Sequence, residues 1–378
     1  MNGSRRLRQV PPGVQCFVGD EARRRRLVEE RVLRVFEGWD YEEIIPPLFD
    51  YADVFAGETL AAKTYSFVGR DGSLLALRPD FTSLIAKIAA GRLAQRPAPI
   101  RLYYSGEVVR YEPPKAGRQS ELYQMGLEHL GGAERAADAE VLAIAAECLA
   151  ATGARDWVLA LGHVGVFAGL LAGSGLDAAT LDELRGRVES KDRLGVRDVL
   201  ARVRAPEAAI ETLERLTTLA GDIRVLDEAE QAFAGSGQAC EAIAELRQVA
   251  LALEAAGLGA HLAIDLGEVR GLDYYTGLVF RVFAAELGFE VGAGGRYDGL
   301  LGRFGRPMPA VGFMLGLDRI ALLLERQGVV PTHARAEPVP VHGGDLGSTL
   351  RLARERRASG VRVRFGNGET AAAEGEGA

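Results

Sequence analysis

The sequence predicts an α+β protein with a mainly antiparallel sheet flanked by helices. Two β-rich runs, over residues 100–111 and 120–130, are joined by a long loop, which indicates an extended hairpin. Residues 176–256 are rich in Leu, Ala, Glu and Arg and have a helical pattern. Strand character then returns between residues 261 and 292. Strands, a helical insertion and further strands together favour an α+β domain.

The first part of the chain is predicted to begin with a loose arm over residues 1–12. Apolar residues at helical spacing then predict a helix over 22–37. Residues 41–48 indicate a strand that ends at two prolines, which belong at the edge or end of a strand. The other elements expected in this part are a hairpin over 65–77 with its turn at 70–72, helices over 82–93 and 136–152, and a strand over 157–163.

The later part of the chain contains strands over 261–268, 277–283 and 290–292, and a strand-to-helix stretch over 310–327. A proline-containing linker over 328–337 follows. The predicted organisation is an arm over 1–12, a first core part over 13–175, a helical insertion over 176–256, a second core part over 257–327, a small βαβ-like unit over 338–366 and a disordered tail over 367–378.

Composition restricts the classes of function. The 378 residues have a formal net charge of −7, which gives no general attraction to nucleic acid. Three widely spaced cysteines indicate reduced thiols, and the five histidines form no ligand cluster, so no metal is expected. No apolar leader follows the N-terminus, and the longest mostly apolar segment is too short to span a bilayer. We therefore expect a cytoplasmic protein with no membrane or nucleic-acid partner.

Strand parity groups several polar side chains. Gln124 and Glu128 share one face of a predicted strand, and Arg110 shares a face with Tyr104 on the neighbouring strand. A common pocket would hold a cation, a carboxylate and an amide, with room for a ligand at Gly106 and Gly126. The alternative is a surface hairpin with a salt bridge.

Two further charged residues lie where helices are predicted to begin. Asp80 follows Arg78-Pro79 and is either a helix N-cap or a carboxylate for a ligand ammonium. Arg319, in the block Gly316-Leu-Asp-Arg-Ile320, suits an anion such as phosphate, or is an ordinary helix-surface arginine. The residues themselves leave both alternatives open.

Two short blocks concentrate polar side chains and glycines: Arg270-Gly-Leu-Asp-Tyr-Tyr275 and Val291-Gly-Ala-Gly-Gly-Arg-Tyr-Asp-Gly-Leu300. So many polar groups in predicted core segments indicate an anionic or zwitterionic ligand. The glycines lack the GxGxxG spacing of a dinucleotide site.

These blocks resemble the two histidine signatures of histidyl-tRNA synthetase and its paralogues. Residues 37–48, 101–131 and 309–324 resemble motifs 1, 2 and 3 of the class II aminoacyl-tRNA synthetases. The resemblance covers about residues 12–326 in the correct order, and it implies the class II synthetase-like core with a dimer formed through motif 1.

The resemblance also implies roles for individual residues. Asp80, Thr82 and Gln124 would hold the α-amino group of histidine, and Glu128 and Tyr275 would face the imidazole. Tyr274 would line the site, and Arg270 would face the carboxylate. Arg110 and Arg319 match the arginines that hold ATP phosphates in the ligase.

Departures from the ligase pattern point to one paralogous family, the regulatory subunits of ATP phosphoribosyltransferase. Only 52 residues follow Arg326, too few for an anticodon-binding domain, and Gly13-Val-Gln-Cys16 replaces the ligase's N-terminal pattern. Residues 46–48 and 77–82 also look more like that family. The resemblance implies a non-catalytic, cofactor-free subunit of the first step of histidine biosynthesis. It would assemble four plus four with a short-form catalytic subunit and mediate activation and feedback inhibition by histidine.

Two other functions remain open. One is a divergent histidine–tRNA ligase, which the retained Arg110, Arg270 and Arg319 favour. The other is a stand-alone amino-acid sensor with a different partner.

Overall fold

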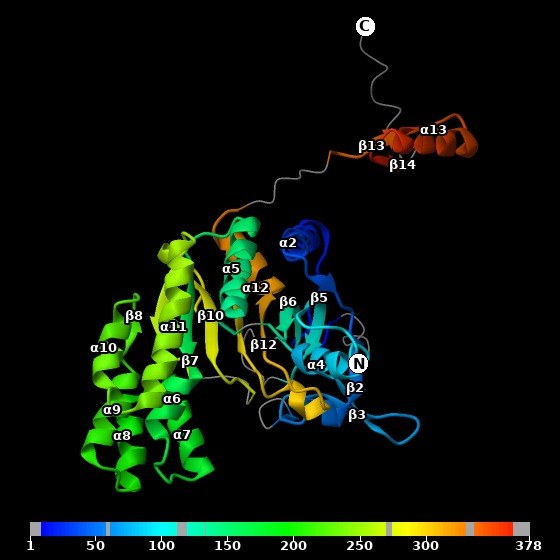
Figure 1. The fold of residues 1–378 in the computed structure, drawn as a ribbon. Helices are drawn as coiled ribbons and strands as arrows, with labels where there is room; N and C mark the ends of the chain where they lie inside the picture. The colour runs from blue at the N-terminus through cyan, green and yellow to red at the C-terminus, as the bar shows by residue number, and fades with distance from the viewer. Residues whose placement is uncertain are drawn as a thin grey trace. The chain divides into compact units, whose positions relative to one another are not determined.

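The computed structural model describes most of the chain (Figure 1). It divides into two compact units, residues 1–329 and 330–378. The predicted hairpin loop over 112–118 and the predicted tail over 367–378 lie outside the described residues. The described residues are 9–57, 61–111, 119–132, 134–269, 274–329 and 336–365.

A nine-stranded sheet organises the first unit. Its strand order is β1-β5-β6-β12-β11-β10-β7-β9-β8, and only the β1–β5 and β7–β9 pairs are parallel. The fold is therefore α+β with a mainly antiparallel sheet, as predicted. The strands are β1 Glu42–Glu43, β5 Ile100–Val109, β6 Glu121–Leu130, β7 Trp157–His163, β8 Ala220–Gly221, β9 Leu262–Asp265, β10 Leu278–Ala284, β11 Gly292–Arg296 and β12 Ala310–Gly316.

Three helices form a layer with the central strands: α2 (Gly19–Gly38), α5 (Glu134–Thr152) and α12 (Leu317–Arg326). Their apolar faces join one large buried cluster with residues of β6, β10 and β12. The ring of Phe36 lies 5.6 Å from that of Tyr103 and 5.9 Å from that of Phe313. Burial of these aromatic faces fixes the helices against the sheet.

A group of helices separates β7 from β9 in sequence and joins the same apolar cluster. The longest of them, α11, packs on α5, α6 and β7 (Figure 1). Asp177, Asp192 and Ser236 accept hydrogen bonds from the first turns of the helices that follow them, which explains where α7, α8 and α11 begin. The helices are α6 Val164–Leu171, α7 Ala178–Glu189, α8 Arg193–Arg202, α9 Glu207–Leu216, α10 Val225–Ala232 and α11 Gly237–Ala255.

A small antiparallel sheet, in the order β2-β4-β3, precedes α4. The predicted hairpin is confirmed: β3 pairs with β4, and Gly72 has a φ of 85° in the turn between them. The elements of this region are β2 Phe49–Tyr51, η1 Ala52–Phe55, β3 Ser66–Val68, β4 Leu74–Leu77 and α4 Thr82–Ala90, and the 3₁₀ turn η3 Leu301–Phe304 contacts α4. The remaining 3₁₀ turn of the described residues, η2 Gly259–His261, precedes β9 in the large sheet.

Two predicted strands have different bounds. The strand expected over 41–48 is reduced to β1, because Pro46 and Pro47 have no N–H to continue a ladder. The strand expected over 290–292 forms instead over Gly292–Arg296. At Gly294 a side chain would collide with the Gly312 carbonyl of β12, so glycine allows β11 to pair with close backbone neighbours.

The second unit contains β13 (Val339–Val341), α13 (Leu346–Ala358) and β14 (Val363–Phe365). The two strands are parallel, and α13 connects them. Asp345 and Ser348 form a capping box at the start of α13. This is a single βαβ element, as predicted for this segment.

Candidate functional site

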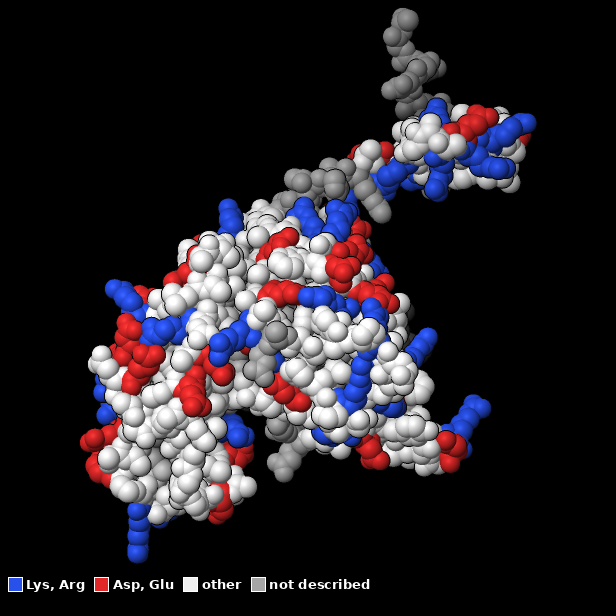
Figure 2. Space-filling view, in the orientation of Figure 1, with Lys and Arg blue, Asp and Glu red and all other residues white. Residues whose placement is uncertain are grey.

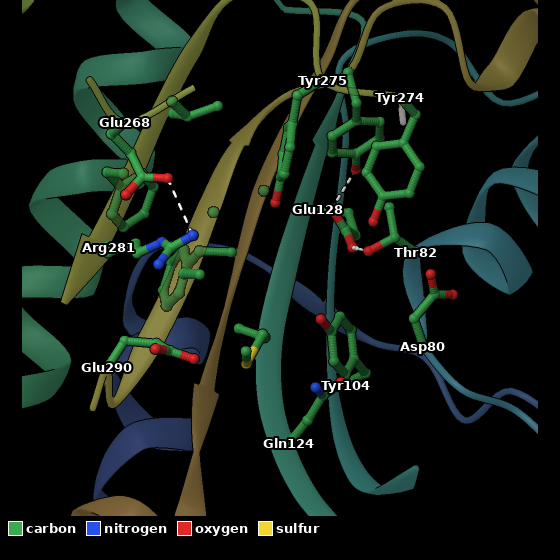
Figure 3. A pocket seen from close by; sticks show the side chains of 18 of the residues that line it. Asp80, Thr82, Tyr104, Gln124, Glu128, Glu268, Tyr274, Tyr275, Arg281 and Glu290 are labelled. Carbon is green, nitrogen blue, oxygen red and sulfur yellow. Dashed lines mark hydrogen bonds and ion pairs between the residues drawn. The ribbon is translucent and has the colours of Figure 1, made fainter. Parts of the chain in front are cut away.

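A cavity of about 240 Å³ opens on the large sheet (Figure 3). Strands β5, β6, β10, β11 and β12 contribute side chains to it, together with the segments before α4 and before β10. Seven of the nine predicted site residues line this cavity: Asp80, Thr82, Arg110, Gln124, Glu128, Tyr274 and Tyr275. Arg319 is not among its lining residues, and Arg270 lies outside the described part of the chain.

The parity argument for β5 and β6 agrees with the structure, which places Tyr104, Arg110, Gln124 and Glu128 around one cavity. The role expected for the glycines was wrong. A Cβ on Gly126 would collide with the Phe313 carbonyl oxygen of β12 and would lie 2.5 Å from the Tyr104 hydroxyl, so that glycine makes room for the neighbouring strand and for the tyrosine ring. Gly106 similarly faces the Arg78 guanidinium. Both glycines accommodate protein side chains.

One side of the cavity, which we call the hydroxyl half, is built around Glu128 and comprises Asp80, Thr82, Glu128 and Tyr297 with the rings of Tyr274 and Tyr275. Glu128 is 1% exposed. The Thr82 hydroxyl donates to its Oε1 at 2.8 Å, and the Tyr297 hydroxyl donates to its Oε2. No cation of the described residues pairs with this carboxylate.

Because Glu128 is buried without a paired cation among the described residues, its carboxylate form is disfavoured. Burial raises the pKa of Glu128 to about 8; the two hydroxyl hydrogen bonds oppose this shift and the charge of Asp80 adds to it. At neutral pH the empty cavity therefore favours a protonated Glu128. A ligand that donates an N–H or carries a positive charge would stabilise the carboxylate form.

Asp80 stabilises the start of α4 and also lines the cavity. Its Oδ1 accepts from the Ser83 backbone N–H at 3.1 Å and its Oδ2 from the Ser83 hydroxyl at 3.3 Å, so it holds the first turn of α4. It also lines the cavity. Burial raises the pKa of Asp80, and the charge of Arg110 opposes the shift.

Aromatic rings form the walls of the hydroxyl half. The Tyr274 ring lies 5.3 Å from that of Tyr275 and 5.8 Å from that of Tyr297, both edge-on. Tyr275 projects between the two sides of the cavity (Figure 3). Its ring leaves no room for a side chain at Gly295, where a Cβ would lie 2.9 Å away. These walls suit a flat, partly polar group.

The other side of the cavity, the arginine half, consists of Glu268, Arg281 and Glu290. Arg281 pairs with Glu268 at 3.1 Å. Glu290 pairs with Arg319, whose Nη1 lies 2.9 Å from Oε1 and 2.7 Å from the Glu290 carbonyl oxygen. Sequence reasoning missed this half. Its available signal was Arg281, a single charge inside the apolar strand Leu278–Ala284.

Within the second polar block, neighbouring residues have different roles. Arg296 is buried and donates to Asp138 at 2.6 Å and to Asp298 at 3.1 Å. It therefore stabilises the end of β11 on the side of the sheet away from the cavity residue Tyr297. Tyr297 was quoted in the block but not selected as a site residue, and the structure adds it to the cavity.

Arg110 lines the cavity and donates from Nε to the Pro79 carbonyl oxygen at 2.6 Å, next to Asp80. In the described part of the chain, no group of three His, Cys, Asp or Glu residues is arranged to hold a metal ion. None of the helices described is both long and apolar enough to cross a membrane.

Comparison with known proteins relates this site to one family. The family model described as Histidyl-tRNA synthetase matches residues 13–320. The ATP phosphoribosyltransferase regulatory subunit of Moorella thermoacetica is 41% identical over 358 residues, which cover 94% of this chain and 91% of that protein. Its counterpart from Desulforamulus reducens is 39% identical over 367 residues, covering 95% and 90%.

Solved structures that resemble this chain point to the same family. A protein from Bacillus halodurans C, described as an ATP phosphoribosyltransferase regulatory subunit/histidyl-tRNA synthetase, has a TM-score of 0.84 and 27% identity, covering 95% of this chain and 92% of that one. A histidine–tRNA ligase subunit from Alicyclobacillus acidocaldarius has a TM-score of 0.67 and 31% identity, covering 85% and 98%. The chain therefore belongs to the family of ATP phosphoribosyltransferase regulatory subunits, which shares a class II aminoacyl-tRNA synthetase-like fold with histidyl-tRNA synthetase.

Proposed function

We propose that this chain is the non-catalytic regulatory subunit of an ATP phosphoribosyltransferase in histidine biosynthesis, and that its cavity binds histidine. The observation that supports this most is the buried Glu128 carboxyl, which has two hydroxyl donors and no paired cation among the described residues. An imidazole N–H gives that carboxyl the partner it lacks.

The rest of the ligand fits the neighbouring groups. Asp80 and Gln124 supply a carboxylate and an amide oxygen for the α-ammonium group, and Tyr275 lines the imidazole position. Arg270, by resemblance, faces the α-carboxylate. A zwitterion with an imidazole side chain therefore meets a complementary group at each polar end.

The names of the relatives support a catalytic partner subunit, and the family resemblance supplies the rest of the proposed assembly. The chain activates a short-form catalytic subunit in a complex of four plus four, and it forms its own dimer through the motif 1 region around α2. Histidine regulates the complex if it binds one state of the assembly more tightly than the other, and this coupling is reciprocal. The complex acts in the cytoplasm.

The test uses the full chain together with a short-form catalytic subunit of ATP phosphoribosyltransferase. We expect co-purification, formation of phosphoribosyl-ATP only when both are present, and inhibition by histidine. Calorimetric titration of the chain alone with histidine should show binding. Failure of the two proteins to form a complex, with and without histidine, would favour a stand-alone sensor.

The ligase is the second candidate, supported by Arg110 in the cavity wall and by the ligase subunit among the similar structures. Aminoacylation of purified tRNA separates the two functions. Robust charging at catalytic concentrations of the chain would overturn the regulatory proposal.

A further inference from the structure

The arginine half and Arg319 form a row of alternating charges. Glu268 follows β9, Arg281 lies on β10, Glu290 precedes β11 and Arg319 is in the first turn of α12. The carboxylates and guanidiniums pair as Glu268–Arg281 at 3.1 Å and Glu290–Arg319 at 2.9 Å. Glu268, Arg281 and Glu290 lie along one side of the cavity (Figure 3). Four elements distant in sequence thus build a row in which each arginine is paired with a carboxyl group.

Arg319 has the setting of a phosphate-binding arginine but different partners. It lies near the N-terminus of α12, beside Gly316, where a guanidinium and backbone N–H groups suit an anion. Here its Nη1 donates to two oxygens of Glu290, one from the side chain and one from the backbone. A carboxylate of the protein itself therefore already accepts from Arg319 Nη1.

Glu290 is ionised in this arrangement. Although burial opposes it, the Arg319 guanidinium lowers the pKa of Glu290 by its charge and by its hydrogen bond. A phosphate group that approached Arg319 would have to displace a charged carboxylate and then remain close to it. Leaving a partly buried carboxylate without its cation is unfavourable, and the two like charges also repel.

Arg281 offers no alternative anchor for a polyanion, because its partner Glu268 lies within the same wall. The row therefore offers a ligand no unpaired guanidinium, because each of its two arginines already has a carboxyl partner. A triphosphate bound along this row would bring several negative charges next to the carboxyl groups of Glu268 and Glu290.

We propose that Glu290, together with Glu268, determines the specificity of the cavity by excluding phosphate-bearing ligands, so that the cavity accepts an amino acid without a nucleotide. This inference rests on the proposed function only for the identity of the amino acid. The proposal predicts that removal of a carboxylate from the row increases the affinity of the cavity for a nucleotide.

The experiment is a calorimetric titration of the full chain with ATP and, separately, with inorganic tripolyphosphate. Glu290→Gln keeps an oxygen that accepts from Arg319 but removes the negative charge. We expect this variant to gain about tenfold in affinity for both probes over the unaltered chain, with a larger gain in Glu268→Gln/Glu290→Gln, since each removed charge weakens a screened repulsion.

Glu325→Gln is the matched control. Glu325 lies on the same helix as Arg319, pairs with Arg24 at 3.0 Å and does not line the cavity, so the substitution changes the net charge equally. No gain is expected in the control. An equal gain there, no gain in Glu290→Gln, or tight ATP binding by the unaltered chain would each overturn the proposal.

Histidine titrations of the same variants separate this proposal from the proposed function. Histidine bound by all variants without any gain in ATP affinity would refute only the exclusion of phosphate. A gain in ATP affinity in a chain that never binds histidine would refute only the proposed function. If Glu290→Gln does not fold, as judged by thermal unfolding, Glu268→Gln alone provides the same comparison, since it removes the other carboxylate of the row.

Discussion

The two halves of the cavity differ in whether their carboxyl groups have a cationic partner within the protein. In the hydroxyl half, Glu128 receives two hydroxyl hydrogen bonds, and no cation of the described residues compensates its charge. In the arginine half, Glu268 and Glu290 each face a guanidinium. The first half lacks a partner that a ligand can supply, whereas the second has its partners within the protein.

This difference separates recognition from exclusion. A buried carboxyl without a counter-charge is costly in the empty protein, and a complementary ligand removes that cost on binding. A self-paired row gives an incoming charge little to gain, because each new contact replaces an existing one. The distribution of charge pairs, and not the number of charged residues, thus decides which ligand each half accepts.

Removal of the Glu128 carboxylate should have the largest effect on histidine binding. Glu128→Ala deletes a charged acceptor for the imidazole N–H, which is worth on the order of 1.5–3 kcal/mol, so the dissociation constant should rise about 10- to 150-fold. Titration calorimetry measures this directly, and the histidine response of the complex should weaken in parallel.

Glu121→Ala is the control for that substitution. Glu121 begins the same strand, is exposed and does not line the cavity. Its removal should leave histidine binding unchanged. An unaltered histidine response in Glu128→Ala would show that the hydroxyl half does not recognise the ligand.

The stability of the ligand-free chain should fall as pH rises toward about 8. The pKa of Glu128 is about 8 in the folded chain, above its ordinary value, so the folded state holds a proton that the unfolded state has released. The stabilisation from this proton is complete below the unfolded pKa and is lost as pH rises through the folded one. Between about pH 6 and pH 8 the loss is at most about 2.7 kcal/mol for one proton.

Urea unfolding of the chain and of Glu128→Gln at several pH values measures this effect. The glutamine does not titrate, so its unfolding free energy should decline less with pH. The pKa of Glu268, which burial raises to about 7, contributes equally to both proteins and cancels in the comparison. Saturating histidine should flatten the slope of the unaltered chain. Parallel slopes for the two proteins would contradict the electrostatic description of the hydroxyl half.

The sequence predicted the hydroxyl half better than the arginine half, for a physical reason. Strand periodicity places Gln124 and Glu128 on one face, and the polar blocks identify Tyr274 and Tyr275, so local patterns were sufficient. The pairs Glu268–Arg281 and Glu290–Arg319 join elements that only the folded sheet brings together. Glu268, Glu290 and Arg319 look like ordinary charged residues near strand and helix ends, and only Arg281, inside the apolar strand β10, stands out in the sequence.

The helices and strands of the fold likewise divide into those that local sequence patterns predict and those that depend on contacts between distant segments. Long elements such as β5, β6 and α5 follow from their periodicity, whereas the bounds of β11 depend on contacts with a neighbouring strand. Gly294 and Gly295 have little strand propensity of their own, yet both pair within the sheet because their missing side chains admit the β12 and β10 backbones. Propensity alone gives no indication of this.

The smallest expected effect comes from Tyr275, which stands between the two halves. Tyr275→Phe keeps the ring that covers Gly295 and removes one neutral hydroxyl, so histidine binding should weaken by about 0.5–1.5 kcal/mol, less than in Glu128→Ala. The same titration calorimetry compares both variants. A larger loss from the tyrosine substitution would mean that the hydroxyl at the boundary, and not the buried carboxylate, dominates recognition, and it would remove the distinction between the two halves.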